Sequence, residues 1–128
     1  MNAETKVLIV TDASEALEPI AQSIKSCLQV CEVKICHAEK FAGTDILPAE
    51  LFFLGCNKPN PASFSYLEEM LSHINFVSRK CGIFSANKES LEYLAGILQD
   101  CEAELGVPLL TDGADKSAIE KWIKGITG

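Results

Sequence analysis

Five short apolar segments alternate along the chain with segments in which apolar residues recur every three or four positions. The apolar segments are residues 6–11, 32–36, 51–55, 80–85 and 107–111. The first, third and fourth are almost continuously apolar, as strands buried on both faces are. Residues 32–36 alternate polar and apolar side chains, and Pro108 lies in the last segment. These two segments therefore suit the edges of a sheet.

The spacing of apolar residues predicts helices after the first, third, fourth and fifth strands. Asn87 is placed to cap the helix after the fourth strand, and Gly106 is expected to end that helix in a left-handed conformation, with Leu105 still on its apolar face. Residues 41–50 contain Gly43 and Pro48 and are short for a helix, so we expect one or two irregular turns there.

Strands that alternate with helices predict a three-layer α/β/α sandwich, formed by a five-stranded parallel sheet with helices on both faces. Right-handed crossovers favour the strand order 2-1-3-4-5, within a single domain over residues 1–128. A ligand is then expected outside the carboxyl ends of the strands. The residues at that edge are 11–16, 56–61 and 85–88.

Composition narrows the range of partners. The 128 residues carry a formal net charge of −7, so a nucleic acid or an anionic membrane surface is not expected as the main partner. No apolar segment is long enough for a signal-peptide core or a membrane span, which favours a cytoplasmic location. In a reducing compartment, the six cysteines are expected as free thiols or small buried apolar residues.

Two blocks of sequence resemble the flavodoxin family. Residues 6–10, a polar loop and residues 20–24 are similar to the start of a flavodoxin, and residues 49–56 followed by 67–71 are similar to its third strand, cofactor loop and helix. The resemblance implies a flavodoxin-like fold and an electron carrier that binds FMN. It places the FMN contacts in three loops. Their candidate residues here are Thr11, Asp12, Ser14, Cys56, Asn57, Lys58, Pro59, Ser85 and Asn87.

All three loops depart from the family pattern. The first lacks the family's Gly and closing Thr, and Asp12 and Glu15 bring negative charge near the expected phosphate. The second has Pro59 where the family has an aromatic residue that stacks on the flavin. The third is short and has neither an aromatic nor an acidic residue.

The sequence therefore predicts an electron carrier with an atypical or weakened FMN site, which would serve a protein redox partner. The alternative is a flavodoxin-like domain that has lost FMN and acts as a binding or interaction module. A self-contained enzyme is less expected than either, because no nucleophile and base fall together at the ligand edge.

Several polar residues have two interpretations. Lys58 and a helix N-terminus could lower the pKa of the Cys56 thiol and make it redox-sensitive, or Cys56 could be an inert apolar filler. Lys58 and Lys88 could bind a small anionic ligand through its phosphate or carboxylate, or could be solvated loop residues. Metal binding is not expected from one further group, because its spacing fits no zinc pattern. That group is Cys27, Cys31, Cys36 and His37.

Overall fold

The computed structural model describes residues 3–128, in which six strands alternate with five α-helices. The strands are β1 (Lys6–Thr11), β2 (Glu32–His37), β3 (Leu51–Gly55), β4 (Lys80–Ser85), β5 (Glu104–Leu105) and β6 (Leu109–Leu110). The helices are α1 (Glu18–Cys27), α2 (Gly43–Ile46), α3 (Ser65–Leu71), α4 (Lys88–Ile97) and α5 (Lys116–Thr127). Short 3-10 turns cover residues 15–17, 38–40 and 62–64.

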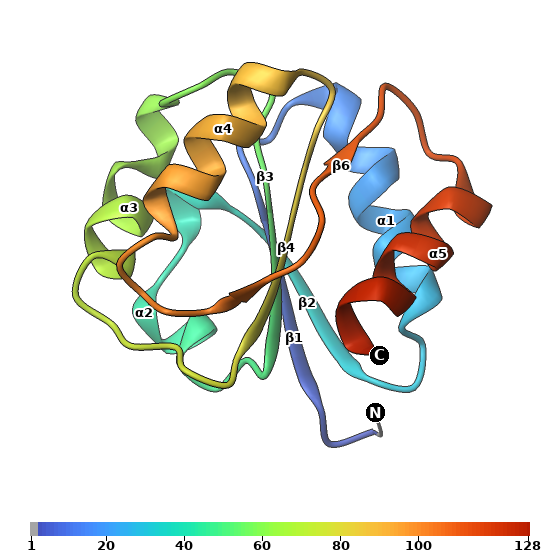
Figure 1. The fold of residues 1–128 in the computed structure, drawn as a ribbon, viewed down its shortest axis with the longest axis horizontal. Coiled ribbons are helices and arrows are strands. Elements are labelled where there is room, and N and C mark those ends of the chain that lie inside the picture. The colour runs from blue at the N-terminus through green and yellow to red at the C-terminus, as the bar shows by residue number, and fades with distance from the viewer. Residues whose placement is uncertain (1–2) are drawn as a thin grey trace.

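The strands form one parallel sheet in the order β2-β1-β3-β4, and the short strands β5 and β6 both pair with β4. Helices α1 and α5 cover one face of the sheet, and α2, α3 and α4 cover the other (Figure 1). This architecture confirms the predicted three-layer α/β fold with strand order 2-1-3-4-5. The number of strands differs, because β5 and β6 replace the single fifth strand predicted over residues 107–111 and the sheet has six strands instead of five. The irregular segment before β3 contains only the single turn of α2, as its glycine and proline suggested.

Alternating side chains of the central strands fill two separate cores. On β3, Phe52 and Leu54 pack under α3 and α4, whereas Leu51 and Phe53 pack under α1 and α5. Both faces of the strand are covered, which explains why its sequence is apolar throughout. The Phe53 ring lies 5.4 Å from the Trp122 ring of α5, between centroids, and so joins the sheet to the last helix.

The segment between α4 and α5 differs from the prediction. Helix α4 ends at Ile97, and Leu105 belongs to β5 instead of the helix. Gly106 is not a left-handed cap: its N–H donates to the Cys81 carbonyl of β4, and a Cβ atom there would lie 2.5 Å from Ile126. Glycine is needed here because α5 approaches the backbone closely. In the sequence, this requirement looks the same as the glycine that often ends a helix.

The register of the central strands brings three loops to one edge of the sheet. Thr11 of β1 is opposite Gly55 of β3, and Gly55 is opposite Phe84 of β4. The carboxyl ends of these strands are therefore level, and the loops that follow them leave the sheet side by side.

Candidate functional site

Hydrogen bonds connect the loops that follow β1, β3 and β4. The backbone N–H of Asn57 donates to Oδ2 of Asp12 over 2.8 Å. The carbonyl of Asn57 accepts from Nδ2 of Asn87 over 2.7 Å. The peptide groups of Asn57 thus lie between a side chain of the first loop and a side chain of the fourth-strand loop. We call these three connected loops, residues 11–17, 56–61 and 85–88, the carboxyl edge.

The first loop uses its own backbone donors. Oγ1 of Thr11 accepts from the N–H of Ala13 over 3.2 Å, and Oδ1 of Asp12 accepts from the N–H of Ser14 over 3.0 Å. Ala13 has a φ of 68°, in the left-handed region, and this sharp turn brings the two side chains back over the backbone. The N–H groups of Ala13 and Ser14 therefore have acceptors within the loop.

The loop after β3 places its residues in different environments. Cys56 is fully buried in the core under α3 and α4, whereas Lys58 and Pro59 are exposed. Burial raises the pKa of the Cys56 thiol to about 12, and the negative charge of nearby Asp12 adds to the increase. The thiol is therefore protonated near neutral pH. Its burial and raised pKa argue against a thiol activated by Lys58 and favour the interpretation of Cys56 as an apolar filler.

The loop after β4 is organised around Asn87. Its Oδ1 accepts from the N–H of Ser90 over 2.8 Å, which confirms the predicted N-cap of α4. Its own N–H donates to Oγ of buried Ser85 over 3.1 Å, while its Nδ2 bonds Asn57 as described. Ser85 and Asn87, the two residues predicted for this loop, therefore hold it in place. Lys88 is exposed beside them.

A surface hollow of about 400 Å³ lies beside the carboxyl edge. Asn87 and Lys88 line one side, and Leu110, Thr111 and Asp112 line the other. The residues after β6 were not among the predicted site residues. They could have been predicted, because a strand that pairs with β4 in parallel must end at the same edge as β4.

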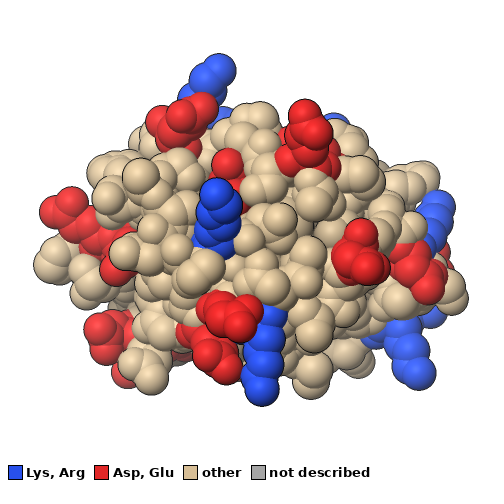
Figure 2. Space-filling model, turned by 90° about the horizontal axis from the view of Figure 1, so that it is seen from above, with Lys and Arg blue, Asp and Glu red and all other residues tan. Residues whose placement is uncertain are grey.

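Charge on this end of the molecule is mixed. Figure 2 shows acidic side chains spread over the visible face with separate basic side chains between them, and no continuous basic patch. An anion that binds here would therefore meet isolated ammonium groups, such as those of Lys58 and Lys88. Both lysines are exposed, and an exposed ammonium group is strongly hydrated.

The loops fit the phosphate of FMN poorly in this conformation. A phosphate needs converging donors, but the N–H groups of Ala13, Ser14 and Asn57 already donate to side chains of the first loop. In addition, Oδ1 of Asn57 is buried and accepts no hydrogen bond from the described residues, so it adds another acceptor where a phosphate would need donors.

The cysteine and histidine group is spread over α1, β2 and the loop between them. His37 at the end of β2 pairs with Glu18 of α1, with 2.8 Å between Nε2 and Oε1. Burial raises the pKa of the Cys36 thiol to about 11. Within residues 3–128, no three His, Cys, Asp or Glu side chains are grouped so that they could hold an ion.

Over the same residues, every helix is too short or too polar to cross a bilayer.

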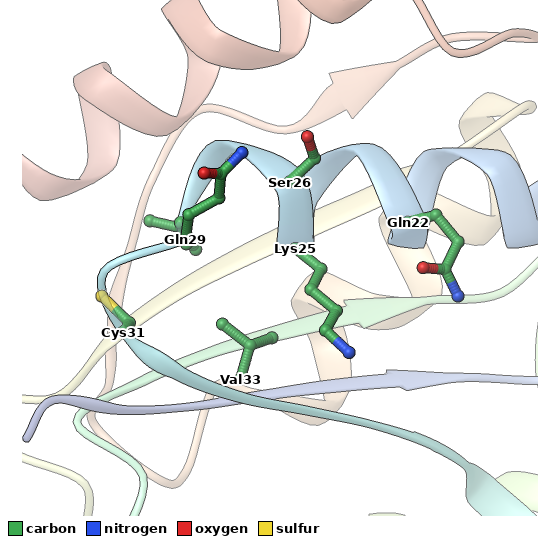
Figure 3. Close-up of a pocket in the computed structure, with 7 residues that line it drawn as sticks. Gln22, Lys25, Ser26, Gln29, Cys31 and Val33 are labelled. Atoms are coloured by element: carbon green, nitrogen blue, oxygen red, sulfur yellow. The ribbon is translucent and has the colours of Figure 1, made fainter. Parts of the chain in front are cut away.

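A second groove, of about 440 Å³, lies between α1 and β2 (Figure 3). Lys25 of α1 extends toward Val33 of β2, while Gln22 and Cys31 lie at opposite ends of the groove. None of its lining residues belongs to the carboxyl edge. The groove offers one ammonium group, amides and a hydroxyl at an open sheet edge, and thus no converging catalytic set.

Solved structures of known proteins are similar to this chain over nearly its full length. No family model and no curated protein matches the sequence. A short-chain flavodoxin associated with a bacterial microcompartment has a TM-score of 0.82 at 10% identity, over 96% of this chain and 97% of that one. Oxidised flavodoxin 2 from Bacillus cereus has a TM-score of 0.80 at 20% identity, over 94% and 97%.

A flavodoxin from Fusobacterium nucleatum, solved bound to flavin mononucleotide, has a TM-score of 0.74 at 12% identity, over 94% of this chain and 95% of its own. These matches span nearly the full length of both partners. They show that the fold of this chain is flavodoxin-like, as the sequence resemblance implied.

Proposed function

We propose that this chain is a flavodoxin-like electron carrier with an atypical, weakened FMN site at the carboxyl edge. The observation that carries the proposal is the junction of three loops through Asp12, Asn57 and Asn87, at the place where parallel α/β sheets bind ligands. Further support comes from a structural neighbour that was solved with flavin mononucleotide bound.

Two features argue that the affinity for FMN is low. The backbone donors of the first loop are occupied by side chains of the same loop. The loops also have no aromatic side chain to stack on the flavin ring, since Lys58 and Pro59 stand at the positions after Cys56. We therefore expect a dissociation constant for FMN above about 1 µM, which corresponds to less than about 8 kcal/mol of binding free energy.

The net charge of −7 supports a basic protein as the redox partner. Association with such a partner is faster when the charges attract over a distance, and salt weakens this attraction. A cytoplasmic location belongs to the same proposal.

A second candidate is favoured by an exposed apolar strip along β5 and β6. Leu105, Val107 and Leu110 are 40%, 78% and 57% exposed, at the edge where the sheet ends. Apolar side chains gathered on an edge indicate a contact surface for another protein. With the flavin lost, the chain would act as an interaction module through this strip.

A flavin titration separates the two candidates. The purified protein is titrated with FMN, and binding is followed by flavin fluorescence and by calorimetry. Saturable binding with a dissociation constant of micromolar order supports the carrier. A protein that is colourless after excess FMN is removed, and that shows no heat or fluorescence change at millimolar FMN, refutes the carrier and supports the module.

Matched charge reversals locate the bound flavin. Lys58→Glu changes an exposed lysine of the carboxyl edge, and Lys25→Glu makes the same change in the α1–β2 groove. FMN affinity should fall severalfold in the first variant and stay unchanged in the second. The opposite pattern would move the ligand to the groove shown in Figure 3.

A further inference from the structure

The carboxylate of Asp12 is bound as an anion by the protein itself. Oδ1 accepts from the N–H of Ser14 in its own loop, and Oδ2 accepts from the N–H of Asn57 in the loop after β3. The two donors belong to segments 43 residues apart in sequence, so the carboxylate fills a small anion-binding nest built by two loops. Hydrogen bonds to an ionised acceptor are stronger than neutral ones.

The backbone of the first loop is shaped around this carboxylate. Ala13 adopts a φ of 68°, a conformation that costs free energy for any residue with a Cβ atom. The turn at Ala13 lets both Thr11 and Asp12 accept from N–H groups two residues ahead. Hydrogen bonds offset the strain, and the donors of the nest are satisfied without a ligand.

We propose that Asp12 determines ligand specificity at the carboxyl edge by standing in for a phosphate. Building on the flavin site proposed above, this predicts that the phosphate receives no hydrogen bond from Ser14 or Asn57 in the wild-type protein, so that FMN binds at most severalfold more tightly than riboflavin. A phosphate dianion could reach the N–H groups of Ser14 and Asn57 only by displacing Asp12, and would then lie near the displaced carboxylate. Both steps oppose binding.

Removing the carboxylate should restore recognition of the phosphate. In Asp12→Ala the N–H groups of Ser14 and Asn57 lose their acceptor and become free for an external anion. We expect FMN affinity to rise about tenfold, the gain of roughly one charged hydrogen bond, while riboflavin affinity stays within about twofold of wild type.

Glu15→Ala is the matched control. It removes one negative charge from the same loop at an exposed residue, and leaves Asp12 in place. The ratio of FMN to riboflavin affinity should stay within about twofold of the wild-type ratio in this variant, because screened charge repulsion alone is weak at the surface. An equal gain in Glu15→Ala and Asp12→Ala would reduce the effect to net charge and overturn the proposal.

Amide NMR provides a readout that does not need flavin. With ¹⁵N-labelled protein, inorganic phosphate should shift the Ser14 and Asn57 amide signals in Asp12→Ala and leave them unchanged in wild type. Asp12→Asn, which keeps the shape of the side chain, gives the same comparison with a smaller response and replaces Asp12→Ala if that variant does not fold.

The outcomes separate this proposal from the proposed carrier function. A phosphate response in Asp12→Ala without flavin binding in any variant supports the role of Asp12 and refutes the carrier. Wild-type protein that binds FMN at least tenfold more tightly than riboflavin supports the carrier and overturns the role of Asp12. Absence of both responses in every variant overturns both.

Discussion

The centre of the sheet and its carboxyl edge are stabilised by different interactions. The centre is apolar: Phe52, Phe53 and Phe84 are fully buried and fill the space between strands and helices. At the edge, by contrast, side chains bond backbone groups of other loops, as Asp12 does with Asn57. The fold is therefore stabilised by many apolar contacts, whereas the shape of the edge depends on a few individual polar atoms.

Truncation of a central aromatic should have the largest effect on stability. Phe53→Ala removes a ring that is fully buried on β3 and packs against Trp122. We expect the free energy of unfolding to fall by about 3–5 kcal/mol, measured by urea denaturation. Phe53→Leu is the control and should lose about 1–2 kcal/mol, because it leaves a smaller cavity. Equal losses in the two variants would show that packing volume is not what matters there.

Loss of the Asp12 carboxylate should cost less. Asp12→Ala leaves the N–H of Asn57 without its acceptor at the junction of the loops, so we expect the free energy of unfolding to fall by about 1–3 kcal/mol. Glu15→Ala, at an exposed position of the same loop, should change stability by less than about 0.5 kcal/mol. An unchanged urea midpoint in Asp12→Ala would mean that the bridge between the loops contributes nothing to stability.

Asn87 allows its two contributions to be measured separately. Asn87→Ala removes both the N-cap of α4 and the bond to Asn57, and we expect a loss of about 1–2 kcal/mol in urea denaturation. Asn87→Ser keeps a capping oxygen and removes the Nδ2 donor to the Asn57 carbonyl. It should retain most of the stability at neutral pH, and a loss as large as that of Asn87→Ala would assign the main role to the bridge.

The fold could be predicted from the sequence because clear apolar patterns recur in several of its strands. Continuous apolar runs at residues 51–55 and 80–85 indicated strands buried on both faces, and the alternating pattern of residues 32–36 indicated an edge strand. The prediction that Gly106 ends a helix was wrong, because glycine is favoured both at the end of a helix and where another helix, here α5, approaches the backbone closely.

The edge could be predicted only in part. Asn87 was recognisable as an N-cap because its partner lies three residues ahead. Its bond to Asn57 spans 30 residues and leaves no local pattern. Likewise, the sequence placed Asp12 near an expected phosphate as a repulsive charge, but gave no sign that its side chain would bind the loop's own donors. The direction in which a side chain points depends on contacts with distant parts of the chain, so the local sequence does not reveal it.

Ala13 offers the smallest change and acts in the stabilising direction. At a φ of 68°, glycine replaces alanine without the clash between Cβ and the backbone, so Ala13→Gly should raise the free energy of unfolding by up to about 1 kcal/mol. Glycine also gains freedom in the unfolded chain, which reduces the benefit. The control is Ala16→Gly, an exposed position without positive φ in the same loop, where the same change should only destabilise. Urea midpoints for the two variants that move in the same direction would show that the left-handed turn at Ala13 is not strained, and the edge would then be shaped by its hydrogen bonds alone.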